Sequence, residues 1–190
     1  MGKKDVELLK QWINPLYLLP ENITKIQQAL RNDGYIQLAE FVLQTPKKLS
    51  WKKSYIPDMH SYQHAALNQD KKVEEFIMSP AFFSLIGTMI GKHVKKVTVE
   101  FLLFQHRDYT LMHDAVSHKG MMFWLDFTKE WDTDFGGQTV FFSDKAPLIF
   151  TSAFASLYFV ALQKNMHMFT KYVNCCAEKK ELFLLRGFLE

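Results

Sequence analysis

The first half of the chain carries apolar residues at helical spacing, three and four positions apart. In PENITKIQQALRNDG this pattern predicts a helix with Asn22 as its N-cap and Gly34 at its stop. The stretch VEEFIMSPAFFSLIGTMIG predicts two helices, because Ser79 can cap the second helix and Pro80 suits its first position. A short strand, YIQLAEF at 35–41, is expected between these helical parts.

After residue 92 the pattern changes to short apolar runs separated by turn sequences. In the first of these runs Val97, Val99 and Phe101 alternate with polar neighbours, which is typical of a strand. The turn sequences DTDFGG, SDKAP, QKN and AEKK separate the later runs. The further predicted strands are MMFWLDF at 121–127, TVFF at 139–142, PLIF at 147–150, SLYFVAL at 156–162, MFTKYV at 168–173 and ELFLLRGFL at 181–189.

About eight short strands that follow two or three helices predict an α+β chain. Its core is expected to be an antiparallel sandwich or jelly roll, with the N-terminal helices packed on one sheet. The sequence contains no internal repeat, low-complexity tract or Ser/Gly linker. We therefore predict a single domain over 1–190, in which 1–92 is a mainly helical support region and 93–190 forms the β core.

Composition limits the classes of function. Hydrophobic residues make up 48% of the chain, so a full core is available. With 23 basic and 20 acidic residues the formal net charge is +3, which is too balanced to require a nucleic acid or an anionic membrane as partner. No apolar run has the length of a signal-peptide core or a membrane span. The two cysteines, Cys175 and Cys176, are adjacent, which indicates a reduced, cytoplasmic protein without a disulfide framework.

The segment QHRDYTLMHD at 105–114 holds two of the seven histidines together with two aspartates. A non-haem Fe(II) site needs two imidazoles and one carboxylate on one face of the metal, and strand ends at the mouth of a jelly roll can bring them together. His106 and Asp108 have a His-x-Asp spacing. His60 and His64 have the four-residue spacing of one helix face and are expected at the surface.

A set of motifs occurs in a fixed order through the second half of the chain. They are RDY at 107–109, TLMHD at 110–114, a hydrophobic strand, WD at 131–132, GGQ at 136–138 before TVFF, and the late His167. In this order they resemble the prolyl-hydroxylase-like branch of the 2-oxoglutarate and Fe(II)-dependent dioxygenases. The resemblance covers roughly 93–190 and, more loosely, the helical start NITKIQQALRNDGYIQL.

The resemblance implies a double-stranded β-helix, with Fe(II) held by an early His-x-Asp or His-x-Glu pair and a late histidine. Carried over to this sequence, His113 falls on the first ligand and His167 on the last. Tyr109, four residues before His113, falls on a tyrosine that helps to hold the co-substrate 2-oxoglutarate.

The same resemblance implies a basic residue beyond the late histidine, which binds the far carboxylate of 2-oxoglutarate. This position falls near Lys179 or Lys180, and we assign it to Lys180. A lysine supplies the charge as a point cation and not as the planar fork of an arginine. Arg186 lies closer to the C-terminus than this position should.

The chain departs from the family pattern at the carboxylate ligand. Ala115 stands two residues after His113, and the neighbouring Asp114 takes the place of the expected residue. Neighbours along a strand point to opposite faces, so Asp114 can act as the ligand only if a bulge re-aims it. His106 and Asp108 remain the alternative pair.

Three functions stay open on this basis. The resemblance implies a dioxygenase that uses Fe(II) and 2-oxoglutarate to hydroxylate a prolyl or other side chain of a protein substrate. The alternative is a catalytically inactive barrel of the same fold, which acts as a binding or interaction module after losing its carboxylate ligand. A third hypothesis is a cupin-like metal protein with chemistry independent of 2-oxoglutarate.

Overall fold

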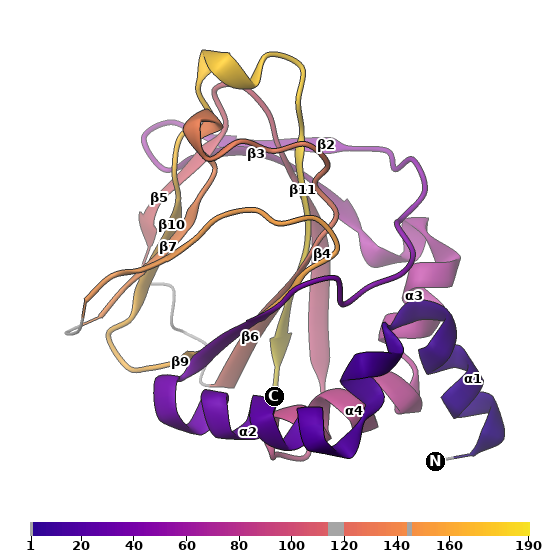
Figure 1. Ribbon diagram of the computed structural model, residues 1–190. Coiled ribbons are helices and arrows are strands. Elements are labelled where there is room, and N and C mark those ends of the chain that lie inside the picture. Colours follow the sequence, from indigo (N-terminus) through magenta and orange to yellow (C-terminus); the bar gives the residue numbers. More distant parts are fainter. Residues whose placement is uncertain (1, 114–119, 144–145) are drawn as a thin grey trace.

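The computed structural model describes the chain except for residues 1, 114–119 and 144–145 (Figure 1). The helices are α1 Lys3–Trp12, α2 Pro20–Asp33, α3 Lys71–Ile77 and α4 Pro80–Ile90, with 3-10 turns η1 Pro15–Leu18, η2 Leu67–Gln69, η3 Thr133–Phe135 and η4 Cys175–Ala177. The strands are β1 Tyr35–Leu38, β2 Lys52–Ile56, β3 His60–Ala66, β4 Val97–Phe104, β5 Tyr109–His113, β6 Gly120–Asp126, β7 Thr139–Phe142, β8 Leu148–Phe150, β9 Leu157–Leu162, β10 His167–Thr170 and β11 Leu182–Leu189.

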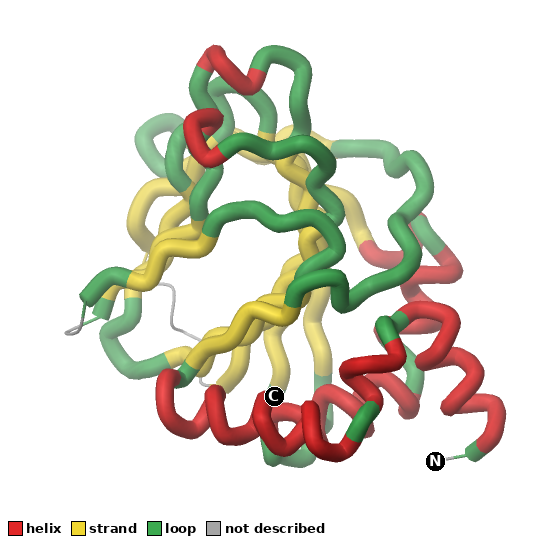
Figure 2. The backbone as a smooth tube through the Cα atoms, viewed as in Figure 1, coloured by secondary structure: helices red, strands yellow, loops and turns green. Residues whose placement is uncertain are grey.

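The strands form one antiparallel sheet that curls on itself (Figure 2). Its order is β1-β9-β6-β11-β4-β3-β5-β10-β7-β8, and β2 pairs with β3 off this path. One layer therefore runs from β1 to β4, and the facing layer contains β5, β10, β7 and β8. Strand β3 joins the layers, because 63–66 pair with β4 while His60 and Ser61 pair with β5. This arrangement is the predicted double-stranded β-helix.

The helices cover the outer face of the layer that contains β6, β9 and β11 (Figure 1). In α4, Phe82 meets Phe123 of β6 with the ring centroids 6.1 Å apart. In α1, Trp12 stacks on Phe76 of α3 at 4.8 Å. Packing of these rings buries the apolar faces of the short helices, which would be marginal on their own. The predicted α+β class, with helices on one sheet, is confirmed.

Both faces of this layer are buried, and side chains alternate between them. Along β6, Phe123 and Leu125 join the cluster under the helices, whereas Met122 and Trp124 join the cluster between the two layers. The run MMFWLDF is therefore apolar at nearly every position.

The helix predictions are confirmed with one correction at a cap. Gly34 ends α2 in the left-handed conformation, with φ 79°. The side chain of Ser79 caps α4 by accepting a hydrogen bond from Phe82 N–H at 3.0 Å. Asn22 is not the N-cap of α2, because the helix already begins at Pro20.

The strands predicted after residue 92 are confirmed within a few residues, although β5 was missed there and two further strands were missed in the first half. Strand β1 is shorter than the predicted 35–41. The strands missed in the first half, β2 and β3, form a hairpin over 52–66. His60 and His64 accordingly lie on a strand, both half-buried, and not on an exposed helix face.

In the described part of the chain no individual helix has the length and apolar character needed to cross a membrane. The pair α3 and α4, bent by 49° at their junction, passes that test jointly by length and composition. Their buried residues pack in the cluster under the sheet.

Replacement of Gly187 by alanine tests the packing between β11 and β6. A Cβ atom at Gly187 would lie 2.3 Å from Cε1 of Phe123 and 2.7 Å from Cγ1 of Val99. We expect Gly187→Ala to lower the free energy of unfolding in urea by about 1–3 kcal/mol, because the ring has to move. Adding Phe123→Leu should recover part of this loss, and strictly additive effects would contradict the assigned contact.

Candidate functional site

The space between the two layers is filled by side chains that point inward from both. At its centre Trp124 of β6 stacks on Tyr158 of β9, with centroids 4.6 Å apart and planes at 5°. Phe141 of β7 also stacks on Trp124, with the ring centroids 6.1 Å apart. We call these three residues the aromatic stack. The void between the layers has a volume of about 10 Å³, roughly the room that one water needs.

Strand β10 carries the late histidine, and its register decides which residues face the interior. Met168 pairs with Phe141 of β7, and paired residues of antiparallel strands share a face. Met168 therefore faces the aromatic stack and lines the void. His167 pairs with Phe142, which stacks on Phe169 at 5.7 Å. Since neighbours along a strand alternate, His167 lies on the outer face of this layer.

Strand β5 carries the first predicted ligand and contains a β-bulge. Between their two paired positions β5 has one more residue than β10. The extra residue falls at Leu111 or Met112, whose side chains are both exposed. The bulge sets His113 opposite Met168. Only the backbone of His113 is described, and Asp114, the predicted carboxylate ligand, lies outside the described residues.

Lys180, the predicted clamp for 2-oxoglutarate, lies at the end of the barrel away from His113. It precedes β11, whose first residue, Leu182, pairs with Phe104 at the end of β4. Strand β5 starts after the turn that follows Phe104 and runs back along the barrel, so its last residue lies at the other end. The Lys180 ammonium forms an ion pair with Glu130. The structure does not bring the predicted clamp and the first predicted ligand together.

Tyr109 belongs to the outer face of β5. Its ring lies 6.3 Å from that of Tyr172. Both residues, with Leu111, Phe169 and others, line a surface hollow of about 400 Å³. The predicted co-substrate tyrosine thus borders a hollow outside the barrel.

Arg186 is a basic residue of the interior that the sequence analysis set aside. It lies on β11 on the same face as Leu184 and Phe188, and it lines the central void. Its Nη2 donates to Glu100 Oε1 at 2.6 Å, while its buried Nε has no hydrogen-bond partner among the described residues. A charged residue in an alternating apolar run was the signal that could have identified it. With His64, it also lines a hollow of about 510 Å³ at the barrel mouth.

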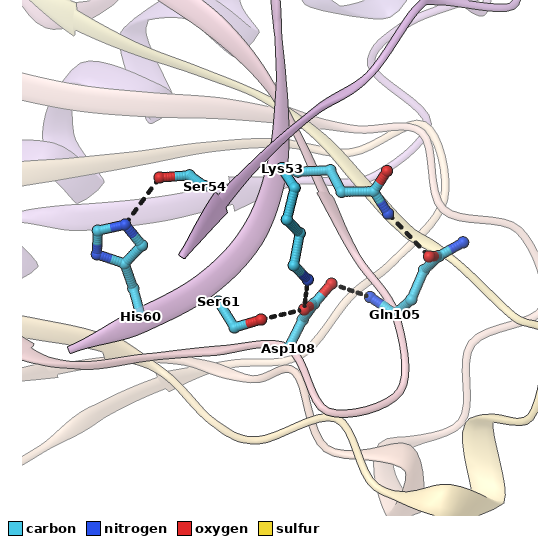
Figure 3. Close-up of polar contacts among 7 residues, drawn as sticks. Lys53, Ser54, His60, Ser61, Gln105 and Asp108 are labelled. Atoms are coloured by element: carbon cyan, nitrogen blue, oxygen red, sulfur yellow. Dashed lines mark hydrogen bonds and ion pairs between the residues drawn. The ribbon is translucent and has the colours of Figure 1, made fainter. Parts of the chain in front are cut away.

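The alternative pair, His106 and Asp108, is not a metal site in the described structure. Asp108 is buried and accepts hydrogen bonds from Ser61 Oγ at 2.7 Å and from the backbone N–H of Gln105 at 3.0 Å. The Lys53 ammonium completes an ion pair with it (Figure 3). His106 lies in edge contact with Tyr172, 6.5 Å between centroids. Asp108 therefore fastens the β4–β5 turn to the β2–β3 hairpin.

Comparison with known proteins adds a family model and a set of solved structures. The model described as "Oxoglutarate and iron-dependent oxygenase degradation C-term" matches residues 4–60. No curated protein sequence matches the chain.

Three solved structures show the same architecture. An oxidoreductase of the 2OG-Fe(II) oxygenase family from Burkholderia pseudomallei superposes with a TM-score of 0.70 at 12% identity, over 88% of this chain and 90% of that one. A Pseudomonas putida prolyl-4-hydroxylase gives 0.66 at 13%, over 88% and 98%. A Trichoplax adhaerens prolyl hydroxylase in complex with a hypoxia-inducible-factor peptide fragment gives 0.68 at 11%, over 89% of each chain. The chain has the fold of the 2OG-Fe(II) oxygenases. At these identities the likeness defines the fold and not the activity.

The described interior does not fit the Fe(II) ion and the 2-oxoglutarate that the superfamily uses. From β10 it is Met168 and not the predicted ligand His167 that faces inward, and a thioether suits softer metals than Fe(II). The enclosed void of about 10 Å³ has room for one water, and the larger hollow that also borders Arg186 lies at the barrel mouth. Arg186, the inward cation, is already paired with Glu100. Among the residues that the structure describes, no three His, Cys, Asp or Glu side chains lie together as a metal site.

One titratable group is fully buried near the end of β6. The carboxylate of Asp126 accepts hydrogen bonds from the backbone N–H of Thr128 at 2.8 Å and of Ala153 at 3.0 Å. Burial raises the pKa of Asp126 to about 6, against the lowering effect of these hydrogen bonds. Burial and the Asp126 charge also raise the pKa of Tyr158. Asp126 thus fixes the segment before β9, at the end of the aromatic stack.

The raised pKa of Asp126 predicts how stability depends on pH. The native chain binds this proton more tightly than the unfolded chain, so the contribution of Asp126 is fully present below about pH 4 and decreases as pH rises through about 6. The loss is on the order of 3 kcal/mol. Urea unfolding at pH 4.5 and 7.5 should show that the stability of wild type relative to Asp126→Asn falls at the higher pH, because the asparagine stays neutral. Asp33→Asn, an exposed control, should show no such change, and a constant difference for Asp126→Asn would contradict the assignment.

Proposed function

We propose that this chain is a non-catalytic member of the oxygenase fold that acts as a binding module. The observation that carries the proposal is the aromatic stack of Trp124, Tyr158 and Phe141, which fills the space between the two layers of the sheet. Opening this interior would require moving rings that are almost completely buried. Truncating one such ring to alanine typically costs about 3–5 kcal/mol, so the stack contributes substantially to the stability of the closed interior.

The position of the predicted ligands supports the same conclusion. Met168 occupies the inward position of β10, and His167 belongs to the outer face. Lys180 is paired with Glu130 at the far end of the barrel. The matching family model covers helices α1 and α2 with the first strands, and none of the strands that would hold a metal ion.

A dioxygenase that hydroxylates a prolyl or other side chain of a protein is the second candidate. It is favoured by the neighbouring positions of β5 and β10, the two strands that carry the predicted histidine ligands. The similar Trichoplax adhaerens enzyme binds a peptide fragment, so a peptide would be the substrate in this case. Bound Fe(II) and 2-oxoglutarate would supply oxidative chemistry, and the chain would have to present His113 and Asp114 to the ion.

The two candidates are separated by anaerobic Fe(II) binding and oxygen-dependent succinate release from 2-oxoglutarate. We expect the wild-type chain to release no more succinate than a protein-free blank. The Pseudomonas putida prolyl-4-hydroxylase, assayed in parallel, serves as the positive control. Succinate that His113→Ala and His167→Ala both abolish would overturn the proposal and identify two ligands.

A second measurement tests the closed interior without any turnover. A ligand that binds only the native state raises the melting temperature, and the stabilisation grows with the logarithm of the ligand concentration once this exceeds Kd. We expect millimolar 2-oxoglutarate with Zn²⁺ or Mn²⁺ as redox-inert substitutes to leave the melting temperature unchanged. A rise that His113→Ala removes would show that the interior admits the co-substrate.

A further inference from the structure

Strand β2 presents a free edge to the solvent. It pairs with β3 over the register Lys52↔His64 to Ile56↔His60. Within the described residues no strand pairs with its other edge. A free edge offers a row of backbone N–H and C=O groups that can accept a further strand.

The edge is held in place by contacts on both sides of the hairpin. Lys53 is paired with the buried Asp108, and Ser54 Oγ lies 2.8 Å from His60 Nε2 (Figure 3). Just before β2, the backbone N–H of Ser50 donates to Gln69 Oε1 at 2.8 Å. A strand that is already fixed in the extended conformation costs less to pair than a flexible one.

The charge of this edge selects the kind of strand that can pair with it. The segment PKKLSWKK at 46–53 contains four lysines and no acidic residue. Only Lys53 among them has an ion pair in the described structure, and the other three side chains are exposed. In an in-register antiparallel pair of two β2 strands, Lys52 and Lys53 would stand opposite Ile56 and Tyr55 of the other copy, so no opposite charge would meet them. An acidic strand would be attracted by the same charges.

The other end of β2 is apolar. Tyr55 is 61% exposed and Ile56 is 45% exposed, so both side chains are available for contact. Read from its N-terminus, a strand that runs antiparallel to β2 would therefore lie opposite the apolar Ile56 and Tyr55 first. It would then lie opposite Ser54, and last opposite Lys53 and Lys52. Complementary side chains at paired positions stabilise such a pair.

We propose that β2 accepts an extended segment of a partner protein as an additional antiparallel strand. Read from N to C, this segment has two apolar residues, one small polar residue and two acidic residues. The proposal rests on the binding role proposed above and identifies the partner's chemistry. Of the acidic pair, one residue stands opposite the exposed Lys52 and the other opposite Lys53, whose ammonium is already paired with Asp108. The apolar pair packs beside Tyr55 and Ile56.

The test uses a fluorescein-labelled peptide with the core Val-Tyr-Thr-Glu-Glu and a second peptide of the same composition with the core reversed. Fluorescence anisotropy of the full chain should show at least about tenfold tighter binding of the forward peptide. Hydrogen–deuterium exchange should show protection of the backbone amides in 52–56 when it is bound. Lys52→Glu should weaken binding about tenfold, because one attraction becomes a repulsion. Lys25→Glu, on the exposed side of α2, should leave binding within twofold.

The outcomes separate this inference from the proposed function. Equal affinity for both peptides, without protection of β2, would mean simple charge attraction and would overturn strand addition. Absence of binding to either peptide would overturn the assigned partner chemistry. Succinate release in the assay above would overturn the proposed function alone, since the β2 edge lies outside the barrel interior.

Discussion

The packing of Trp124 against Tyr158 and Phe141 is the contact on which the rest of the structure depends, because it joins the two layers of the curled sheet. Each ring comes from a different strand, so the register of three strands has to be satisfied at once. A shift of one residue would turn a whole strand over and remove its ring from the interior. The inward Met168 and the outward His167 follow from this constraint, because β10 pairs directly with the strand of Phe141.

Two buried aspartates of the described chain connect segments at the ends of the barrel, away from the central void. Asp108 joins the β4–β5 turn to the hairpin of β2 and β3. Asp126 joins the end of β6 to the segment before β9. A buried carboxylate is tolerated when donors surround it, and both have at least two such donors. The acidic residues that first indicated a catalytic role at 105–114 are thus explained in part by the closure of a turn.

Helices α2, α3 and α4 and most of the later strands could be predicted because their apolar spacing is set by burial on one or two faces, whereas α1 and β5 were missed. Strands β2 and β3 could not be predicted, because KKSYI and HSYQHAA have few apolar residues and take their extended form from mutual pairing and from β4. The family landmarks also proved structural in part. Trp131 donates its indole N–H to Gly136 O at 3.1 Å. Gly136, at φ 84°, leaves no room for a side chain against the Tyr172 carbonyl.

The candidate site was less predictable than the fold, because a site depends on which face each residue takes. The bulge in β5 changes the residue that stands opposite Met168, and no local pattern in TLMHD indicates it. Spacing along the chain, such as that between His113 and His167, carries no information on this point. A sequence can therefore keep the landmarks that specify the curled sheet while methionine, and not the late histidine, faces inward from β10. The edge of β2 does not depend on which residue faces inward from β10, since the pairing of β2 with β3 and its lysines do not involve the interior. On the function proposed above, binding would therefore use a surface that is separate from the barrel interior.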